Sequence, residues 1–334
     1  MRTEIILLFG GESDERLVSV ASAQAMAEQI NCHKIWYLNP KLEVFALSST
    51  ELLAHQNPFT HEFIPNSQPL FSTLNQAISS QDSKNCVFLL ALHGGMGEDG
   101  TLQAMLEQGG RHFTGSDSTS SKQAFNKLAT KKALANQDIK LAPHIIFENP
   151  EQLRIFMIEH KNLVLKPVSG GSSLGCYFVK TQEQFNYAIE QLKNSQISYF
   201  AESMILGREL TVGVIESKNG LIALPATEIV TNQSRNFDYE GKYLGLGSQE
   251  ITPAHISIEL LSAAQNLALK AHHILGLSGY SRTDMIATDS GLYFLEINTL
   301  PGLSKKSLVP QQLAAAGISF AQFLRDQVDL ANSK

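Results

Sequence analysis

Apolar residues gather in short continuous runs that alternate with longer stretches of helical spacing. Runs at residues 5–9 and 86–92 are each followed by a pair of glycines and then by a helical pattern, at residues 17–29 and 101–108. A buried strand, a glycine turn and a helix form the repeating unit of an α/β layer. We therefore expect residues 1–120 to form an α/β domain around a parallel sheet.

Two segments of this first domain lie outside that repeat. Residues 34–38 predict a second strand. Residues 40–82 are polar and contain several prolines, which indicates a loop-rich insertion with one short helix at residues 74–79.

The pattern changes after residue 120. A lysine-rich helical stretch at residues 120–136 comes first, and a second helix is expected at residues 182–193. Short strand patterns lie between and after these helices, at residues 163–166, 176–179 and 199–204. Short strands with one covering helix suit a small central domain, residues 121–207.

The remaining residues, 208–334, favour an α+β domain. Strand patterns at 209–215 and 221–226 flank a Lys-Asn-Gly turn, and a hairpin begins at Tyr280. A long amphipathic helix is expected at 257–275. Residues 231–253 are polar and rich in glycine and tyrosine, which predicts a mobile loop.

Composition narrows the class of protein. The 334 residues carry a formal net charge of −6, whereas a nucleic-acid-binding protein needs a basic surface. Three scattered cysteines suit a reducing compartment and have no zinc-site spacing. We see neither a signal peptide nor an apolar stretch of membrane-spanning length. A cytoplasmic enzyme that binds neither nucleic acid nor membrane is expected.

The C-terminal hairpin carries the clearest chemistry. If its turn centres on Ser290, Asp284 lies opposite Glu296, and Asn298 shares the face of Glu296 because strand side chains alternate. Two carboxylates at about 5 Å repel each other, so a cation should lie between them. Oxygen ligands favour Mg²⁺ held together with substrate phosphates. The alternative is an ordinary hairpin with a solvated acidic face.

Two further segments suggest a nucleotide. Lys166 precedes the glycine- and serine-rich residues 169–175, whose backbone N–H groups can hold phosphate oxygens. The segment 202–209 has an apolar centre that could stack on a flat ring, with a carboxylate at each end. Taken singly, the first segment also fits a flexible hairpin turn, and the second fits a plain linker.

The order of these segments resembles the ATP-grasp superfamily and, within it, the D-alanine–D-alanine ligase family, over nearly the whole chain. Six segments carry the resemblance. They are Gly10-Gly11-x-Ser13-x-Glu15; His93-Gly94 with Gly97-Glu98-Asp99-Gly100-Thr101-Leu102-Gln103; Lys166-Pro167 with Gly171-Ser172-Ser173-x-Gly175; Asp238-Tyr239-x-x-Lys242-Tyr243; Arg282-x-Asp284; and Glu296-x-Asn298-Thr299-x-Pro301-Gly302 with Ser307-Leu308.

The resemblance implies a two-step reaction in peptidoglycan precursor synthesis. The carboxylate of one D-alanine attacks the γ-phosphate of ATP to form an acyl phosphate. The amine of a second D-alanine then attacks that carbonyl, and D-alanyl-D-alanine, ADP and phosphate result. The family also implies two Mg²⁺ or Mn²⁺ ions and a homodimer.

The resemblance assigns nucleotide and metal roles residue by residue. Lys127, Lys166 and Lys242 face the phosphates, and the loop that includes Ser172 covers them. Metal ions fall to Asp284, Glu296 and Asn298. Adenine and ribose contacts fall to five residues of the linker, namely Glu202, Ser203, Met204, Ile205 and Glu209.

Substrate roles follow in the same way. Glu15 pairs with the ammonium of the first D-alanine and forms a hydrogen-bonded trio with Ser172 and Tyr243. His93 contacts substrate. Arg282 and the N–H of Gly302 hold the oxygen that becomes negative, and Ser307 with the N–H of Leu308 binds the second carboxylate. Arg282 could instead pair with Asp284 or Glu296, or do both.

Alternatives remain open for the second substrate. The nucleophile could be D-lactate, D-serine or another amine, although Tyr243 favours an amine. A nucleotide-binding relative without catalysis is a further alternative. Lys305 and Lys306 lie between Gly302 and Ser307, so we hypothesise that they alter pH dependence or substrate preference.

Overall fold

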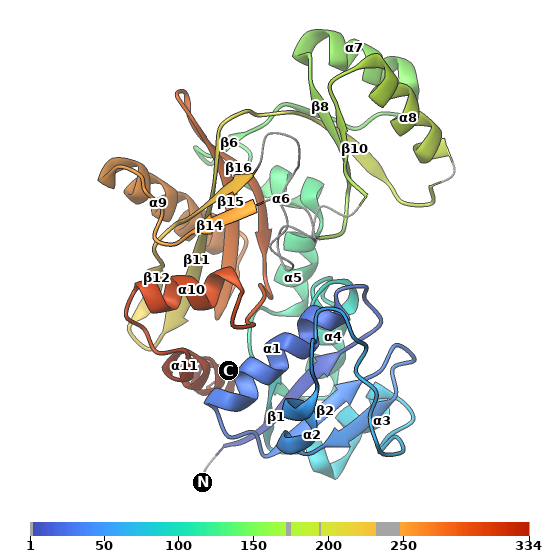
Figure 1. Cartoon of the computed structure of the whole chain (residues 1–334), viewed down its shortest axis with the longest axis vertical. Coiled ribbons are helices and arrows are strands. Elements are labelled where there is room, and N and C mark those ends of the chain that lie inside the picture. The colour runs from blue at the N-terminus through green and yellow to red at the C-terminus, as the bar shows by residue number, and fades with distance from the viewer. Residues whose placement is uncertain (1–2, 172–174, 194, 232–247, 334) are drawn as a thin grey trace.

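Three β-sheets with covering helices make up the computed structural model, which describes residues 3–171, 175–193, 195–231 and 248–333. Figure 1 shows the N-terminal sheet at one end, a small sheet with α7 (Pro150–His160) and α8 (Gln182–Lys193) at the other, and the C-terminal sheet between them. The expected α/β and α+β architecture is confirmed.

The first sheet has the order β3-β2-β1-β4-β5 and is parallel except for β3. Its strands are β1 (Glu4–Gly10), β2 (Lys34–Leu38), β3 (Val44–Leu47), β4 (Cys86–Leu90) and β5 (His112–Phe113). The helices α1 (Arg16–Gln29) and α4 (Thr101–Gln108) follow β1 and β4. The chain proceeds in opposite directions from β1 and β4, and such a switch point opens a crevice at the strands' carboxyl ends.

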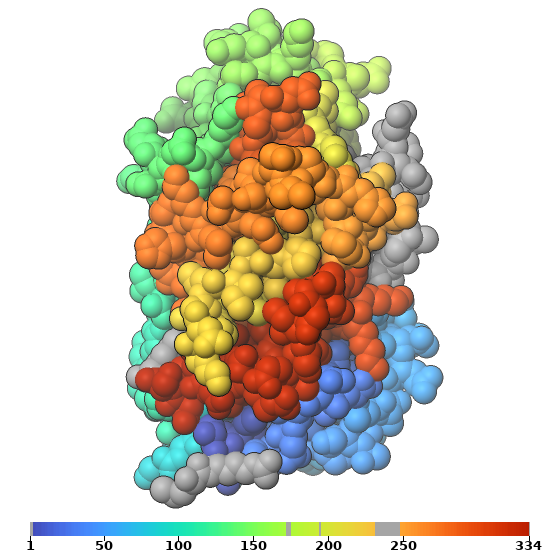
Figure 2. Space-filling model, turned by 90° about the vertical axis from the view of Figure 1, so that its left-hand side faces the viewer, coloured from blue at the N-terminus to red at the C-terminus, as the bar shows by residue number. Residues whose placement is uncertain are grey.

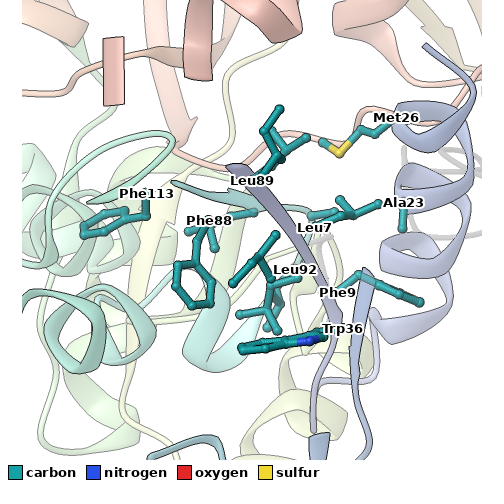
Figure 3. Close-up of a cluster of buried hydrophobic side chains, with 14 of the residues drawn as sticks. Leu7, Phe9, Ala23, Met26, Trp36, Phe88, Leu89, Leu92 and Phe113 are labelled. Carbon is teal, nitrogen blue, oxygen red and sulfur yellow. The ribbon is translucent and has the colours of Figure 1, made fainter. Parts of the chain in front are cut away.

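The core of this domain is packed on both faces of β1. Figure 3 shows Ala23 and Met26 of α1 directed toward Leu7 and Leu89 of the sheet. Phe88 lies on the other face, and its ring centroid is 5.9 Å from that of Trp36. These residues are all buried, so the crevice stands on a rigid base.

The insertion at residues 40–82 is more ordered than its sequence indicates. The expected helix is confirmed as α3 (Leu74–Ser79), but β3, α2 (Ser49–Ala54) and the 3-10 turn η1 (Gln81–Ser83) were missed. β3 has only four residues and is defined by antiparallel pairing with β2, a non-local contact that leaves little local pattern.

The second sheet has the order β7-β10-β8-β9 and carries two helices. The elements are β7 (His144–Ile145), α7 (Pro150–His160), β8 (Leu163–Pro167), β9 (Tyr177–Val179), α8 (Gln182–Lys193) and β10 (Tyr199–Ser203). Helix α7 was not predicted, although Asn149 caps its N-terminus and Pro150 opens it. Those two residues are a recognised start signal.

The third sheet has the order β14-β13-β11-β15-β16-β6, with β12 paired to β11. Its elements are β6 (Lys140–Leu141), β11 (Arg208–Ser217), β12 (Gly220–Ala223), β13 (Thr227–Thr231), β14 (Ser248–Ile251), α9 (Ile258–Ile274), β15 (Tyr280–Thr288) and β16 (Gly291–Asn298). Residues 232–247 of the expected mobile loop lie outside the described residues. Residues 248–251, which were included in that loop, instead pair with β13.

The lysine-rich stretch forms two helices rather than one, α5 (Ser118–Phe125) and α6 (Lys127–Leu134). Asn126 breaks the stretch because its side chain accepts a hydrogen bond from the Ala129 N–H and caps α6. Ala124 and Leu134 share the hydrophobic core of the third sheet. The α5–α6 segment therefore packs against the third sheet, whereas the sequence placed it in the central domain.

The chain ends with α10 (Leu308–Ala315) and α11 (Phe320–Asn332). Phe323 and Leu324 of α11 join the core of the first domain, and Figure 2 shows this red segment resting on the blue N-terminal part. The predicted domain boundaries after residues 120 and 207 therefore do not follow the packing at every point. The division into domains stays a prediction. Within the described residues, no helix is both long and apolar enough to cross a membrane.

Gly10 tests the turn that leads from β1 to the crevice. Its φ is +98°, and an added Cβ would lie 2.2 Å from the Leu38 carbonyl oxygen. We predict that Gly10→Ala lowers the free energy of unfolding by about 2–5 kcal/mol, from backbone strain and overlap together. Gly110, with a φ of +64° and open space around it, is the control, and Gly110→Ala should cost about 1 kcal/mol. Urea unfolding of both variants checks this, and equal losses would contradict it.

Candidate active site

A cavity of about 420 Å³ lies between the second and third sheets. The two sheets contribute facing walls, with the segment 202–209 passing between them. Its lining includes Lys127, Lys166, Gly170, Gly171, Cys176, all residues from Glu202 to Glu209, Glu228, Asp284 and Glu296. The structure therefore brings together most of the residues that the sequence assigned to a nucleotide.

The β15–β16 hairpin places its polar residues on one face through a bulge. Thr288 pairs with Gly291 across a two-residue turn, and the register shifts by one between Met285 and Asp284. Asp284 then pairs with Glu296, as the sequence predicted, and Arg282 pairs with Asn298. The sequence placed the centre of the turn on Ser290, whereas it lies between Asp289 and Ser290. The bulge adds one residue to β16, and the pairing of Asp284 with Glu296 is kept for that reason.

Asp284 is held by three neighbours. Arg282 donates from Nε and Nη2 to its two oxygens at 2.9 and 2.7 Å, and the Thr211 hydroxyl donates at 2.5 Å. The Asn298 amide nitrogen lies 3.4 Å from Asp284 Oδ2. The ion pair considered for Arg282 is thus present with Asp284, and this bidentate contact fixes both side chains.

The oxygen donors on this face suit a hard divalent cation. Asp284, Glu296 and the amide oxygen of Asn298 are oxygen ligands of the type that Mg²⁺ prefers. The described residues contain no group of three or more His, Cys, Asp and Glu side chains arranged for a metal. A cation here would therefore need further oxygens from a ligand, which is usual for Mg²⁺ with phosphates.

Lys127 joins the hairpin to the glycine-rich loop. Its ammonium lies 3.5 Å from Glu296 Oε2 and donates to the Gly170 carbonyl oxygen. Its backbone N–H donates to the Val168 carbonyl at 2.8 Å, and Asn126 forms a β-bridge with Ser169. The start of α6 therefore holds the loop over the cavity.

Glu202 forms ion pairs with two ammonium groups. Lys166 Nζ lies 2.5 Å from Glu202 Oε2, and Lys131 of α6 pairs with Oε1. For Glu202, burial acts to raise the pKa, but the two lysines outweigh it and lower the pKa. The sequence predicted Glu202 and Lys166 but missed Lys131, because helical spacing does not reveal which of several lysines is buried.

The linker residues that the resemblance assigned to adenine and ribose lie along one cavity. Ser203, Met204, Ile205 and Glu209 all line the cavity. At its rim, Arg208 forms a bidentate pair with Glu228, with both distances at 2.7 Å. This pair fixes the start of β11 beside Glu209.

Glu15 lies in the crevice of the first sheet, where β1 leads into α1. It is 7% exposed, and its Oε2 would lie 3.3 Å from a Cβ added to Gly171. The glycine-rich loop of the central sheet therefore reaches the carboxylate of the first domain. Ser172, Lys242 and Tyr243 lie outside the described residues, so the predicted trio stays a prediction.

Glu98 is a neighbouring carboxyl. It belongs to one of the family motifs, but no role was predicted for it. Its Oε1 accepts a hydrogen bond from the Gly94 N–H at 2.9 Å. Burial, followed by repulsion from Glu15, raises its pKa to about 8. The crevice therefore favours the protonated form of the Glu98 carboxyl near neutral pH.

His93 is buried between two elements. One ring nitrogen is 2.9 Å from the Ser22 hydroxyl, and the other is 2.9 Å from the Leu300 carbonyl oxygen. Burial lowers its pKa to about 4, so the ring is neutral at physiological pH. These contacts join the first domain to the loop before Gly302, and they do not by themselves support the predicted substrate contact.

Gly302, Ser307 and Leu308 belong to the C-terminal loop that contacts His93 and Ser22 through Leu300 and Leu303. All three are buried, and Ser307 precedes α10, which Leu308 opens. Its hydroxyl lies 2.8 Å from that of Ser304. Lys305 is directed elsewhere, because its ammonium pairs with Glu28 of α1 at 2.5 Å. That pairing gives no support to a role for Lys305 in substrate choice.

The raised pKa of Glu98 makes stability depend on pH. Because its folded pKa of about 8 exceeds its ordinary value of 4.5, the folded state binds the extra proton between those values. This contribution is fully present below pH 4.5 and is lost as pH rises through 8. We predict that the free energy of unfolding of the native protein, relative to that of Glu98→Gln, falls between pH 5.5 and 8.5. Urea titrations at both pH values measure this difference, and a constant difference would contradict the assignment.

Comparison with known proteins gives the family. Two family models cover most of the chain. The model described as "D-ala D-ala ligase N-terminus" matches residues 4–116, and "D-ala D-ala ligase C-terminus" matches residues 134–329. Both contain the segments that carried the resemblance.

Individual relatives agree with the models. The chain is 34% identical to a D-alanine–D-alanine ligase of Leptospira interrogans, covering 98% of this chain and 97% of the relative. It is also 34% identical to one of Flavobacterium johnsoniae, covering 98% of each. Among solved structures, the VanG D-Ala:D-Ser ligase of Enterococcus faecalis is 29% identical with a TM-score of 0.83, covering 99% of this chain and all of that one. The expected ATP-grasp fold is confirmed, and the chain belongs to the D-alanine–D-alanine ligase family of ATP-dependent ligases.

Proposed function

We propose that this chain joins two D-alanines through an acyl phosphate in the cavity between its second and third sheets. ATP is consumed, ADP and phosphate are released, and the product serves peptidoglycan synthesis. One observation carries the placement of the chemistry. The face of the β15–β16 hairpin that bears Asp284 and Glu296 lines the same cavity as Lys127 and Lys166.

The nucleotide is bound along the linker. Met204 and Ile205 contact the adenine ring, Glu202 accepts from its exocyclic amine, and Glu209 binds the ribose. Lys127 and Lys166 then face the phosphates, because both line the cavity together with Gly170 and Gly171, and the Lys127 ammonium donates to the Gly170 carbonyl oxygen. Lys242 and Ser172 complete this set in the proposal. Preorganised cations stabilise the charge of phosphoryl transfer.

Asp284, Glu296 and Asn298 would hold two divalent ions, either Mg²⁺ or Mn²⁺. When bound, such ions neutralise the phosphates and orient the γ-phosphoryl group. Arg282 and Thr211 fix Asp284 for this task through the hydrogen bonds described above. Without a bound cation, the Lys127 ammonium balances the negative charge of Glu296.

The amino acids bind beside Glu15. Its carboxylate pairs with the ammonium of the first D-alanine, and Ser172 and Tyr243 close over it. The approach of Gly171 to Glu15 supports this closure. Arg282 and the Gly302 N–H hold the developing oxyanion, while Ser307 and the Leu308 N–H bind the second carboxylate at the start of α10. His93 supports this loop through Leu300.

D-serine is the second candidate for the attacking amine. The observation that favours it is the similarity to the VanG D-Ala:D-Ser ligase. D-lactate is less favoured, because Tyr243 indicates an amine. A cytoplasmic location and a homodimer belong to the same proposal, and three free cysteines are consistent with a reducing compartment.

The reaction is tested by ATP-dependent phosphate release with D-alanine, L-alanine, and D-alanine mixed with D-serine or D-lactate. We expect release with D-alanine alone and D-alanyl-D-alanine as the product by mass spectrometry. No release with D-alanine would contradict the reaction. Mixed dipeptide as the dominant product would favour the second candidate.

The role of the hairpin is tested by Asp284→Asn, with Asp289→Asn in the exposed turn of the same hairpin as the control. We expect kcat to fall by about 10²–10³ in Asp284→Asn, because one carboxylate ligand and the partner of Arg282 are lost. Asp289→Asn should retain kcat within about twofold. A similar kcat for both variants and the native chain would contradict the placement.

A further inference from the structure

Lys131 is a buried cation that the proposed reaction does not use. Its side chain is 2% exposed and is paired with Glu202, whose side chain is also 2% exposed. Among the described residues that line the cavity, Lys166 and Glu202 are included and Lys131 is not. Lys131 therefore reaches the cavity only through Glu202.

Three elements build this ion cluster. Lys131 comes from α6, Lys166 from β8 and Glu202 from β10. β8 and β10 are antiparallel neighbours with Lys166 opposite Phe200, so Glu202, two residues further along, lies on the same face as Lys166. α6 then approaches the free side of the carboxylate. Each oxygen of Glu202 thereby has its own ammonium partner.

The charges of the cluster do not cancel. Lys166 and Glu202 alone would be a neutral pair facing the cavity, and phosphate groups would gain little from it. With Lys131 added, two positive charges share one negative charge, which leaves a net charge of +1. Burying an ammonium is costly, and apolar side chains in place of a whole buried ion cluster often serve stability equally well. A purely structural explanation of Lys131 is therefore weak.

The titration behaviour agrees with this geometry. Burial alone would lower the pKa of Lys166, but Glu202 overrides it and raises that pKa. Burial lowers the pKa of Lys131, and Glu202 opposes that change. Pairing thus favours the charged form of every member of the cluster.

We propose that Lys131 is a positioning residue for ATP binding. Lys131 balances half of the negative charge of Glu202, so that the positive charge of the Lys166 ammonium stays available to the nucleotide phosphates. The inference rests on the proposed placement of ATP in the cavity. It predicts that Lys131 contributes to the binding of the triphosphate and not to that of the base. A structural role would affect both parts of the nucleotide alike.

The test compares the dissociation constants of ATP and adenosine for the full chain, measured by calorimetric titration or displacement. In Lys131→Met, we expect the ATP constant to rise by about tenfold or more, as removal of a nearby charge predicts. The adenosine constant should change by less than about threefold. Lys132→Met on the exposed face of α6 is the matched control and should alter neither. Lys131→Arg should restore the preference for ATP.

A double variant separates charge from packing. Lys131→Met with Glu202→Gln again leaves a net charge of +1, carried by Lys166 alone, and has no unpaired buried carboxylate. We expect its ratio of adenosine to ATP dissociation constants to return to within about threefold of the native ratio. Should Lys131→Met fail to fold, this double variant still decides the matter, because a ratio that stays low overturns the proposal.

Two results for Lys131→Met also overturn the inference, and one result for Lys166→Met overturns the proposed placement of ATP. If Lys131→Met weakens ATP and adenosine equally, or leaves both unchanged, Lys131 does not act through charge. Lys166→Met distinguishes the levels. Unchanged ATP affinity in Lys166→Met would refute the placement of ATP itself. Weakened ATP binding in Lys166→Met, together with an unaltered ratio in Lys131→Met, would refute only the role of Lys131.

Discussion

The pairing register of β15 and β16 is the constraint on which the site depends. The two-residue turn alone would place Asp284 opposite Leu295 and would put Glu296 on the other face of the sheet, because a one-residue slip exchanges the faces of a strand. The bulge between Asp284 and Met285 restores the pairing of Asp284 with Glu296. A bulge that re-aims a side chain beside an active site is a recurrent use of this feature.

Each carboxylate of the site is matched with a cation, which comes from the same strand for Asp284 and from other elements for Glu296 and Glu202. Asp284 faces Arg282, Glu296 faces Lys127, and Glu202 is shared by Lys131 and Lys166. α6 supplies two of these cations, and it packs with the core of the third sheet while reaching the loop of the second. The ion pair between Lys131 and Glu202 joins α6 to the second sheet, so it also links the two walls of the cavity.

The sequence predicted what depends on local pattern. Strands that precede glycine turns and the helix α8 follow from spacing and alternation. The pairing of Asp284 with Glu296 was also predicted, but it depends on a bulge that spacing does not reveal. The family motifs then predicted the site as a set. Lys127 and Glu202, which lie outside the six quoted motifs, both line the cavity.

What the sequence did not reveal depends on contacts between distant segments. β6 has two residues and exists only through its pairing with β16. Lys131 differs from its neighbours Lys127 and Lys132 by burial against Glu202 and not by spacing. Glu98 acquires its raised pKa from burial and from Glu15. The internal contacts of His93 with Ser22 and Leu300 likewise follow from tertiary packing.

The most direct test of the account is the position of a divalent cation on the hairpin face. A crystal grown with Mn²⁺ and a non-hydrolysable ATP analogue would locate the metal by its anomalous scattering. The account predicts a peak at roughly 2.0–2.3 Å from carboxylate oxygens of both Asp284 and Glu296, between them and the phosphates. A nucleotide-bound structure with the metal away from these residues, or with the two carboxylates on opposite faces of the sheet, would contradict it.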